Sequence, residues 1–421
     1  MLLRALCGSL TLLCTTGLLS AQSIWNTTTG SWFTSTHWSP TGVPTDASDI
    51  QVNNGGTAQI SASGAVSYEA LLGNLASGNG TVEVLGNGAW STAILTVGVA
   101  GTGKLLISGT GQVISSGSFV AFDENSTGTV EVSGGKWTSN NALFIGYRGT
   151  GSLEISGTGV VVAQAGLHMA VFSTGSGTLT LRGDATSRGV LITPFVNEMN
   201  NMGGKVIFDG GVLRASSSSA DFIANFEAGD VQIRNGGAYI DTNGFNVTIS
   251  TVLQDAPGQD GRLFKQGAGT LTLTGVNTYV GGTTVQQGTL TLGDGTNPAA
   301  LVALSLGRTS VILNATTTFN VAANATVTGG TGVYGGGSGD PGGDGVSAGN
   351  GASVFNSGTI TGGVGGLGEW DGGQGGAGVR LAAAGEVVNA GTITGGSTGS
   401  NISEEIKFDG RGGVGVILGN G

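Results

Sequence analysis

Glu131 and Glu154 are the two acidic residues whose spacing suggests chemistry. They occupy the same place in two copies of a short phrase, "GTVEVSG" from Gly128 and "GSLEISG" from Gly151. If the copies form adjacent strands, the two carboxylates lie about one strand spacing apart, ~4.8 Å. A pair of carboxylates flanking a glycosidic bond is what most glycoside hydrolases use to cleave it. One alternative function is therefore an extracellular enzyme that acts on polysaccharides.

The surroundings of this pair favour a simpler interpretation. Lys136 and Arg148 are the only basic candidates nearby, which is fewer than a hydrolase site needs. No groove with aromatic platforms is indicated beside the glutamates. We therefore interpret Glu131 and Glu154 as two exposed glutamates on a polar face, rather than as a catalytic pair.

Two serine motifs also invite a catalytic interpretation. "GVSAG" (Gly345–Gly349) and "GGSTG" (Gly395–Gly399) fit the pattern G-x-S-x-G. That motif requires a turn from a strand to a helix, and a histidine partner. The chain has two histidines and no helical pattern, and 84 of its 421 residues are glycine, so chance explains both matches.

The histidines do not indicate a zinc site. Cys7 and Cys14 are the only cysteines and both lie at the N-terminus, so His37 and His168 lack the further ligands that such a site needs. His168, in "AGLHMAVF", is expected to be a packed residue.

Two loop features point weakly to binding. Asp340 and Asp344, in "GSGDPGGDG", are a candidate for weak calcium binding through oxygen ligands, but they do not fit the calcium-binding nonapeptide pattern, and solvated carboxylates are the preferred interpretation. Arg182-Gly183-Asp184 resembles an integrin-binding tripeptide, although matches of three residues are weak evidence. The sequence predicts no catalytic, cofactor-binding or metal-binding residue.

A repeat organises the chain that carries these residues. Copies of one phrase begin at Gly80, Gly103, Gly128, Gly151, Gly177, Gly204 and Gly229, so the spacing is 23 to 27 residues. Each copy has two aliphatic or aromatic residues two positions apart, which places both on one face of a strand. A period in the twenties predicts a solenoid. We therefore predict an all-β fold, a parallel β-helix whose core consists of the stacked pairs.

The N-terminal residues divide into two segments. Residues 1–21 resemble a signal peptide, with Arg4, an apolar run and Ala21 at the cleavage point. Residues 22–79 are predicted to form an N-terminal cap and the first coils, because Trp25, Trp32 and Trp38 are concentrated there and an open end of a β-helix needs a cover. An aromatic platform for sugars is the alternative interpretation of the three tryptophans.

The main array is predicted over 80–330, and a glycine-rich β-repeat segment over 331–421. In the second segment "VFNSGTITGG" from Val354 recurs as "VVNAGTITGG" from Val387. The long glycine loops between these strands are expected to be mobile, since glycine has much backbone entropy to lose. The net charge of −11 argues against nucleic acid as a partner.

The segment "FKQGAGTLTLTGVNTYVGGTTVQQGTLTLG", residues 264–293, resembles the autotransporter-associated β-strand repeat of type V secretion passenger domains. Its glycine-threonine-leucine phrase returns after nineteen residues. The 80–235 array and the "NSGTITGG" units are also similar to repeats of exported bacterial proteins. This resemblance implies a right-handed parallel β-helix on the surface of a Gram-negative bacterium, held in the outer membrane by a C-terminal β-barrel.

The barrel strands are missing from this sequence, so we expect the 331–421 segment to be truncated. The expected function is adhesion or cell–cell association, with a host surface, a polysaccharide or another copy of the chain as the partner. The alternatives are the polysaccharide-acting enzyme and a structural spacer whose functional domain lies elsewhere. No cofactor is implied.

Overall fold

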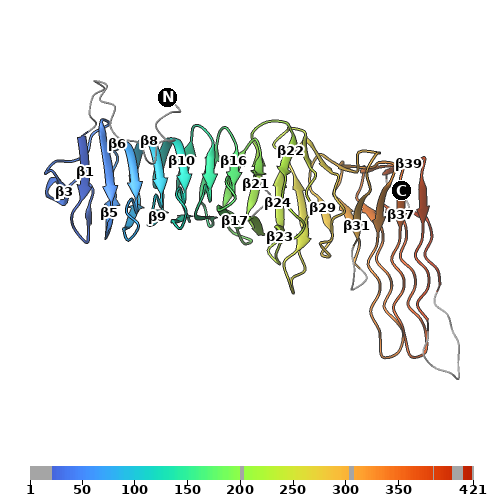
Figure 1. The fold of residues 1–421 in the computed structure, drawn as a ribbon. Coiled ribbons are helices and arrows are strands. Elements are labelled where there is room, and N and C mark those ends of the chain that lie inside the picture. Colours follow the sequence, from blue (N-terminus) through green and yellow to red (C-terminus); the bar gives the residue numbers. More distant parts are fainter. Residues whose placement is uncertain (1–20, 200–202, 303–307, 383, 401–410, 420–421) are drawn as a thin grey trace.

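The protein is a long column of stacked β-strands. The structure, a computed structural model, describes residues 21–199, 203–302, 308–382, 384–400 and 411–419. The predicted signal peptide lies outside these residues except for Ala21. Figure 1 shows strands that follow one another along a single axis. The pairing between coils is parallel, as between β1 and β4. The predicted all-β parallel β-solenoid is therefore confirmed.

Equivalent strands of successive coils form four ladders. The first ladder contains β1 Ala21–Trp25, β4 Ser48–Val52, β6 Ala65–Leu72, β8 Ala89–Val97, β10 Gln112–Val120, β12 Lys136–Ser139, β15 Val160–Ala163, β18 Val190–Thr193, β21 Val212–Ala215, β24 Ala238–Asp241, β27 Leu263–Gln266, β29 Thr283–Val285, β32 Val311–Leu313, β35 Val346–Ala348, β38 Val379–Leu381 and β41 Val416–Leu418. The second begins beside the end of β10 and contains β13 Leu143–Ile145, β16 Leu167–Met169, β19 Val196–Glu198, β22 Ser219–Ala224, β25 Val247–Ile249, β28 Thr270–Leu273, β30 Thr289–Leu292, β33 Thr318–Val321, β36 Ser353–Asn356 and β39 Glu386–Asn389.

The other two ladders follow one another along a further side of the column. The third contains β2 Thr29–Ser31, β5 Asn54–Ile60, β7 Asn79–Val84, β9 Thr102–Ile107, β11 Thr127–Val132, β14 Thr150–Ile155, β17 Ser176–Arg182, β20 Gly204–Asp209, β23 Val231–Ile233 and β26 Gln254–Asp255. The fourth contains β31 Ala299–Val302, β34 Ala325–Thr328, β37 Thr359–Thr361 and β40 Thr392–Thr394.

The core lies along the axis of the column, as the period of two predicts. In the third ladder the inward-facing pairs are stacked in register, so that Val130 pairs with Leu153 and Val132 with Ile155. All the predicted pairs from Val82/Val84 to Val231/Ile233 are at most 1% exposed. Because each pair is covered by its equivalents in the neighbouring coils, one continuous apolar core runs through the coils.

The repeated phrase "GTLTL" occupies two different ladders. In residues 177–181 it lies in β17 of the third ladder, whereas in residues 269–273 it lies in β28 of the second, paired with β25 and β30. Leu271 and Leu273 are buried as predicted, but they do not continue the third ladder. β28 follows β27 of the first ladder, and the coil that starts at β28 is short, since Leu271 pairs with Leu290 only nineteen residues (290 − 271) further on. Residues 274–282 between them form no strand.

The three N-terminal tryptophans are packed against each other at the end of the column. Trp25, Trp32 and Trp38 are at most 1% exposed, and Trp38 makes edge-to-face contacts with the other two at 5.0 and 4.8 Å. The Trp38 indole N–H donates to the Trp32 carbonyl at 2.8 Å. A short 3₁₀ helix, η1 Ser35–His37, leads into β3 Trp38–Ser39, which pairs antiparallel with β1. The sugar-platform interpretation of these rings is therefore wrong, because no ring face is accessible.

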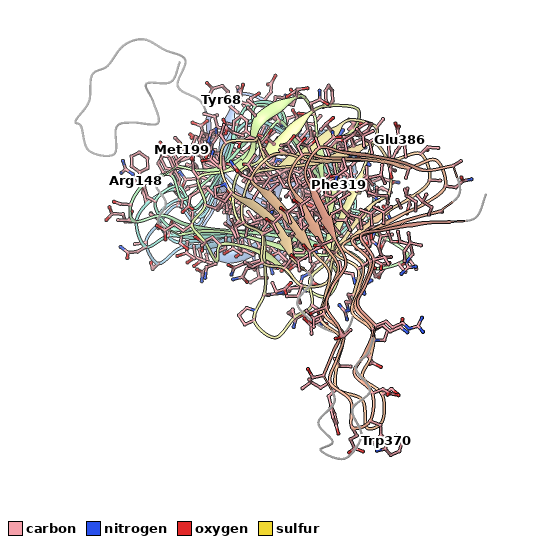
Figure 2. All side chains as sticks on the ribbon, turned by 90° about the vertical axis from the view of Figure 1, so that its right-hand side faces the viewer. Tyr68, Arg148, Met199, Phe319, Trp370 and Glu386 are labelled. Atoms are coloured by element: carbon pink, nitrogen blue, oxygen red, sulfur yellow. The ribbon has the colours of Figure 1, made fainter. Side chains whose placement is uncertain are left out.

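A flat projection leaves the column near its C-terminal end, as Figures 1 and 2 show. We call it the glycine fin. It consists of first arms, 329–337, 362–370 and 395–400, and return arms, 338–345, 371–378 and 411–415. Within 362–367 burial has a period of three residues. Two buried glycines are followed by one exposed residue, Val364, and the same pattern repeats up to Leu367. A helix with three residues per turn and no hydrogen bonds within its own segment is a polyproline-II-type helix.

Hydrogen bonds in the fin run between arms in two directions. The first glycine of a triplet bonds to the same arm of the next coil, as Gly332 N–H does to the Val364 carbonyl at 2.8 Å. The second bonds across to the other layer, as Gly366 N–H does to the Asp340 carbonyl at 2.7 Å. The third residue of each triplet faces outward. Instead of the mobile loops that we expected, these segments form a bonded double layer.

Candidate interaction surfaces

The two predicted glutamates lie side by side, but each is neutralised by a basic residue from another coil. Glu131 and Glu154 are paired in register on the outer face of the third ladder. Lys104 Nζ lies 2.8 Å from Glu131 Oε1, and Arg182 Nε lies 2.9 Å from Glu154 Oε2. All four side chains are about two-fifths exposed or more, and exposed ion pairs of this kind contribute roughly 0–1 kcal/mol. The arrangement is a line of paired charges along the column.

Neither predicted basic partner belongs to this line. Lys136 begins β12 in the first ladder. The Arg148 guanidinium carbon lies 4.6 Å from the ring centre of Phe172. Lys104 and Arg182 take their places. Each lies one coil away and two positions along the strand from the register partner of its glutamate, which is Leu106 for Glu131 and Thr180 for Glu154.

The charged side chains of the tripeptide Arg182-Gly183-Asp184 contact other residues of the chain. Arg182 also contacts Asp209 at 3.3 Å, and Asp209 in turn lies 3.7 Å from Arg234. Asp184 Oδ1 accepts hydrogen bonds from the Thr186 and Ser187 N–H groups, at 2.7 and 2.9 Å. The hydrogen bond from the Thr186 hydroxyl, followed by these two backbone bonds, lowers the pKa of Asp184 to about 2. The arginine and the aspartate are therefore both engaged in intramolecular contacts.

Aromatic side chains from four successive coils gather on the outside of the second ladder. We call this group the outer aromatic cluster; it contains Phe119, Phe122, Phe144, Tyr147, His168, Phe172 and Phe195. Phe119 and Phe144 stack at 5.2 Å with an angle of 9° between their planes, and Phe122 and Tyr147 at 4.9 Å with 3°. Phe172 is 37% exposed. The sequence indicates these residues only when the coils are aligned.

His168 is part of this stack, as its predicted role of packed residue requires. It is half-buried and stacks on Phe144 at 5.3 Å, with Phe195 edge-on at 5.2 Å. Its Nδ1 atom is buried and has no hydrogen-bond partner in the described part of the chain. Burial lowers the pKa of His168, because the charged form would lose solvation.

We expect His168 to make the column less stable in acid. Its pKa is lower in the folded chain than in the unfolded chain, so stability is full above about pH 6.5 and falls as the pH drops below that value. The variant His168→Phe keeps a stacked ring and has no proton to gain. Thermal unfolding at pH 8 and pH 5 should therefore show a smaller acid-induced decrease in Tm for the variant than for the wild type. Equal decreases would contradict this assignment.

The remaining candidate residues are spread over the molecule. Asp344 is engaged by Arg380 at 2.6 Å and by the Ala377 N–H at 2.9 Å, whereas Asp340 is exposed. Ser347 of "GVSAG" lies in β35 and Ser397 of "GGSTG" in the fin, in coils other than those of the two histidines. Among the described residues no three His, Cys, Asp or Glu side chains are placed to share a metal ion. In the same residues no helix has the length and apolarity to cross a membrane.

A buried lysine fixes the corner between β27 and β28. Lys265 is fully buried, and its ammonium donates to the Thr242 hydroxyl at 2.9 Å and to the carbonyls of Gln266, Gly267 and Gln287 at 2.8, 2.6 and 3.0 Å. Burial lowers the pKa of Lys265 to about 8, and the nearby Asp241 carboxylate opposes this shift. A charged residue inside an apolar column was not foreseen from the sequence, which shows only a lysine at an inward position of a strand.

The β-solenoid and one repeat within it indicate the class, an autotransporter passenger-like β-helix domain. The Passenger-associated-transport-repeat family model matches residues 263–292, from β27 to β30, and includes Lys265. This repeat is typical of autotransporter passenger domains, so the predicted resemblance is confirmed. Comparison with curated proteins and with solved structures gave no match.

Proposed function

We propose that this protein is a passenger exported to the cell surface, where it mediates adhesion or association between cells. The passenger-associated repeat supports the export. The proposal rests mainly on one observation, the pairing of charges between coils along the third ladder instead of their convergence in a groove. A surface on which similar groups recur coil after coil suits many weak contacts, which add up through effective concentration.

The outer aromatic cluster supplies the strongest single contact face. Exposed apolar patches are typical of interaction sites. Arg148 lies beside Phe172 at the rim and offers a cation to the partner. The partner is a host surface, a surface polysaccharide or another copy of the chain. The net charge of −11 argues against nucleic acid.

The test is to display the chain on a bacterium that neither aggregates nor adheres by itself. Settling of the cells and their attachment to host cells should both be compared with an empty-display strain. Phe172→Ser should reduce the response several-fold, whereas Tyr68→Ser should not. Both residues are 37% exposed. Figure 2 shows Tyr68 at the top of the molecule and Arg148, which lies against Phe172, at its left edge. If display changes neither property, the adhesion proposal fails and a spacer role is favoured.

The same experiment addresses the enzyme alternative. Glu131→Gln combined with Glu154→Gln leaves the shape of the column unchanged and removes both carboxylates. If adhesion is a binding property, the double variant should adhere like the wild type. Release of reducing sugars by the wild type but not by the double variant would replace the adhesion proposal by polysaccharide hydrolysis.

A further inference from the structure

The outer face of the first-arm layer of the fin is apolar. Its exposed large side chains are Tyr334, Val364, Leu367 and Trp370, with exposed fractions of 52, 40, 48 and 64%. Trp370 lies at the far end of the fin (Figure 2). The return-arm layer carries Pro341, Gln374 and Arg411 at its exposed outward positions instead. The fin is therefore amphipathic, although its interior consists of glycine backbone.

This apolar face is ridged with a fixed period. Val364 and Leu367 stand three residues apart, which in a polyproline-II-type helix is about 9.3 Å. A shallow groove lies among these side chains, and Tyr334, Thr398 and Ser400 from the neighbouring coils also line it. Ridges can enter grooves over several triplets only when the partner surface has the same period. Another copy of the first-arm layer has that period.

The backbone of the face points to the same partner. The N–H groups of Val364 and Leu367 are bonded to no acceptor in the described part of the chain, whereas the glycines between them bond to neighbouring arms. These outward N–H groups recur every third residue, so a layer of equal pitch can approach them in register. An anionic surface is a poor partner for this face, because the face carries the carboxylate of Glu369. This carboxylate accepts a hydrogen bond from the Tyr334 hydroxyl at 3.1 Å.

We propose that the first-arm faces of two copies of this chain dock on each other. The contact is two-fold symmetric, with the same patch on both copies. Four side chains bury much less than the roughly 800 Å² per partner of a stable interface, so a single contact is weak. Many copies on facing cells make it effective. The inference deepens the proposed function by naming the partner, and its biological use rests on that function.

Disulfide trapping tests this weak contact directly. Cys7 and Cys14 are the only cysteines, so their replacement by serine gives a cysteine-free background. Val364→Cys and Leu367→Cys place a thiol on the proposed contact face, and Gln374→Cys places a thiol at an exposed position of the return-arm layer. On mild oxidation of the purified protein, at least one of the first two variants should form dimers at least ten-fold faster than Gln374→Cys. Equal rates for all three variants would overturn the proposal.

A second measurement uses Trp370 as a reporter. Of the six tryptophans, the other five are at most 1% exposed. Raising the protein concentration should shift Trp370 emission to the blue and raise the sedimenting mass together. Leu367→Asp should abolish both changes, and Gln374→Asp should preserve them. A blue shift of dilute monomer on neutral phosphatidylcholine vesicles, without dimers at high concentration, would overturn self-docking in favour of a lipid surface.

The outcomes separate this inference from the proposed function. If displayed cells associate while the purified chain gives no trapped dimer, fin docking is wrong and adhesion stands. If the purified chain forms the dimer while displayed cells neither associate nor adhere, the proposed function is wrong and the docking surface stands.

Discussion

Replacing Gly366 by alanine should open the glycine fin and leave the column folded. A Cβ atom at this position would lie only 2.0 Å from the Val333 carbonyl oxygen of the neighbouring arm. The restriction is one of space, since the backbone of Gly366 is not in the left-handed region. Overpacking of a close contact costs about 1–3 kcal/mol. Amide hydrogen exchange in residues 362–378 should therefore accelerate roughly five-fold to more than a hundred-fold, with exchange in β11 and β14 unchanged.

Gly336 provides the matched control. It lies in the same fin, and nothing is within 4 Å of the position that a Cβ atom would take. Gly336→Ala should exchange like the wild type. If both variants exchange at the wild-type rate, the neighbouring first arms are not in the close contact that the structure shows. If both accelerate equally, the fin is sensitive to glycine entropy and not to the close approach of its arms.

Replacing Lys265 by methionine should weaken the column by about 2–4 kcal/mol. Methionine keeps the apolar stem but removes the ammonium donor from the carbonyls of Gly267 and Gln287, whereas the Gln266 carbonyl still accepts from Thr242. Each buried acceptor that loses its partner costs roughly 1–3 kcal/mol, and the relief from burying a charge offsets part of the sum. The midpoint of urea-induced unfolding should decrease, and amide exchange should accelerate first in β27 and β28.

Lys205→Met is the corresponding control. Lys205 also lies in a strand of the column, but its side chain is exposed. Its replacement should change stability by less than about 0.5 kcal/mol, as surface substitutions usually do. A Lys265→Met protein as stable as Lys205→Met would show that the buried ammonium contributes nothing to the corner.

Much of the column can be predicted from local patterns. The two-residue period identifies the inward side chains, because a strand has only two faces and solvent takes one of them. The limits of this reasoning appear where a strand must choose a ladder. "GTLTL" has the same inward leucines in β17 and β28, but the two strands lie in different ladders on different sides of the column. The turn-forming segment 274–282, "TGVNTYVGG", forms no strand, but it does not indicate which ladder the strand before it joins.

The surfaces were less predictable than the core. Partners on a solenoid lie one coil apart, so Lys104 and Glu131 meet across 27 residues (131 − 104) of sequence, and a search among near neighbours finds Lys136 instead. The fin was missed for a similar reason. Its triplets "GGVGGLG" and "GGQGGAG" are visible in the sequence, but their bonding partners are arms of other coils. When those partners are not known, the same glycines predict loose loops.

The fin and the column advance together by one step per coil, yet they use different backbone geometries. Residues 329–345 and 362–378 leave and re-enter the column at equivalent places, and both contain seventeen residues. Adding one triplet to each arm of every coil would lengthen the glycine fin by about 9.3 Å without altering the coils of the column at its base. Small in-frame insertions can therefore change how far the fin projects from the column without any change in the coils of the column.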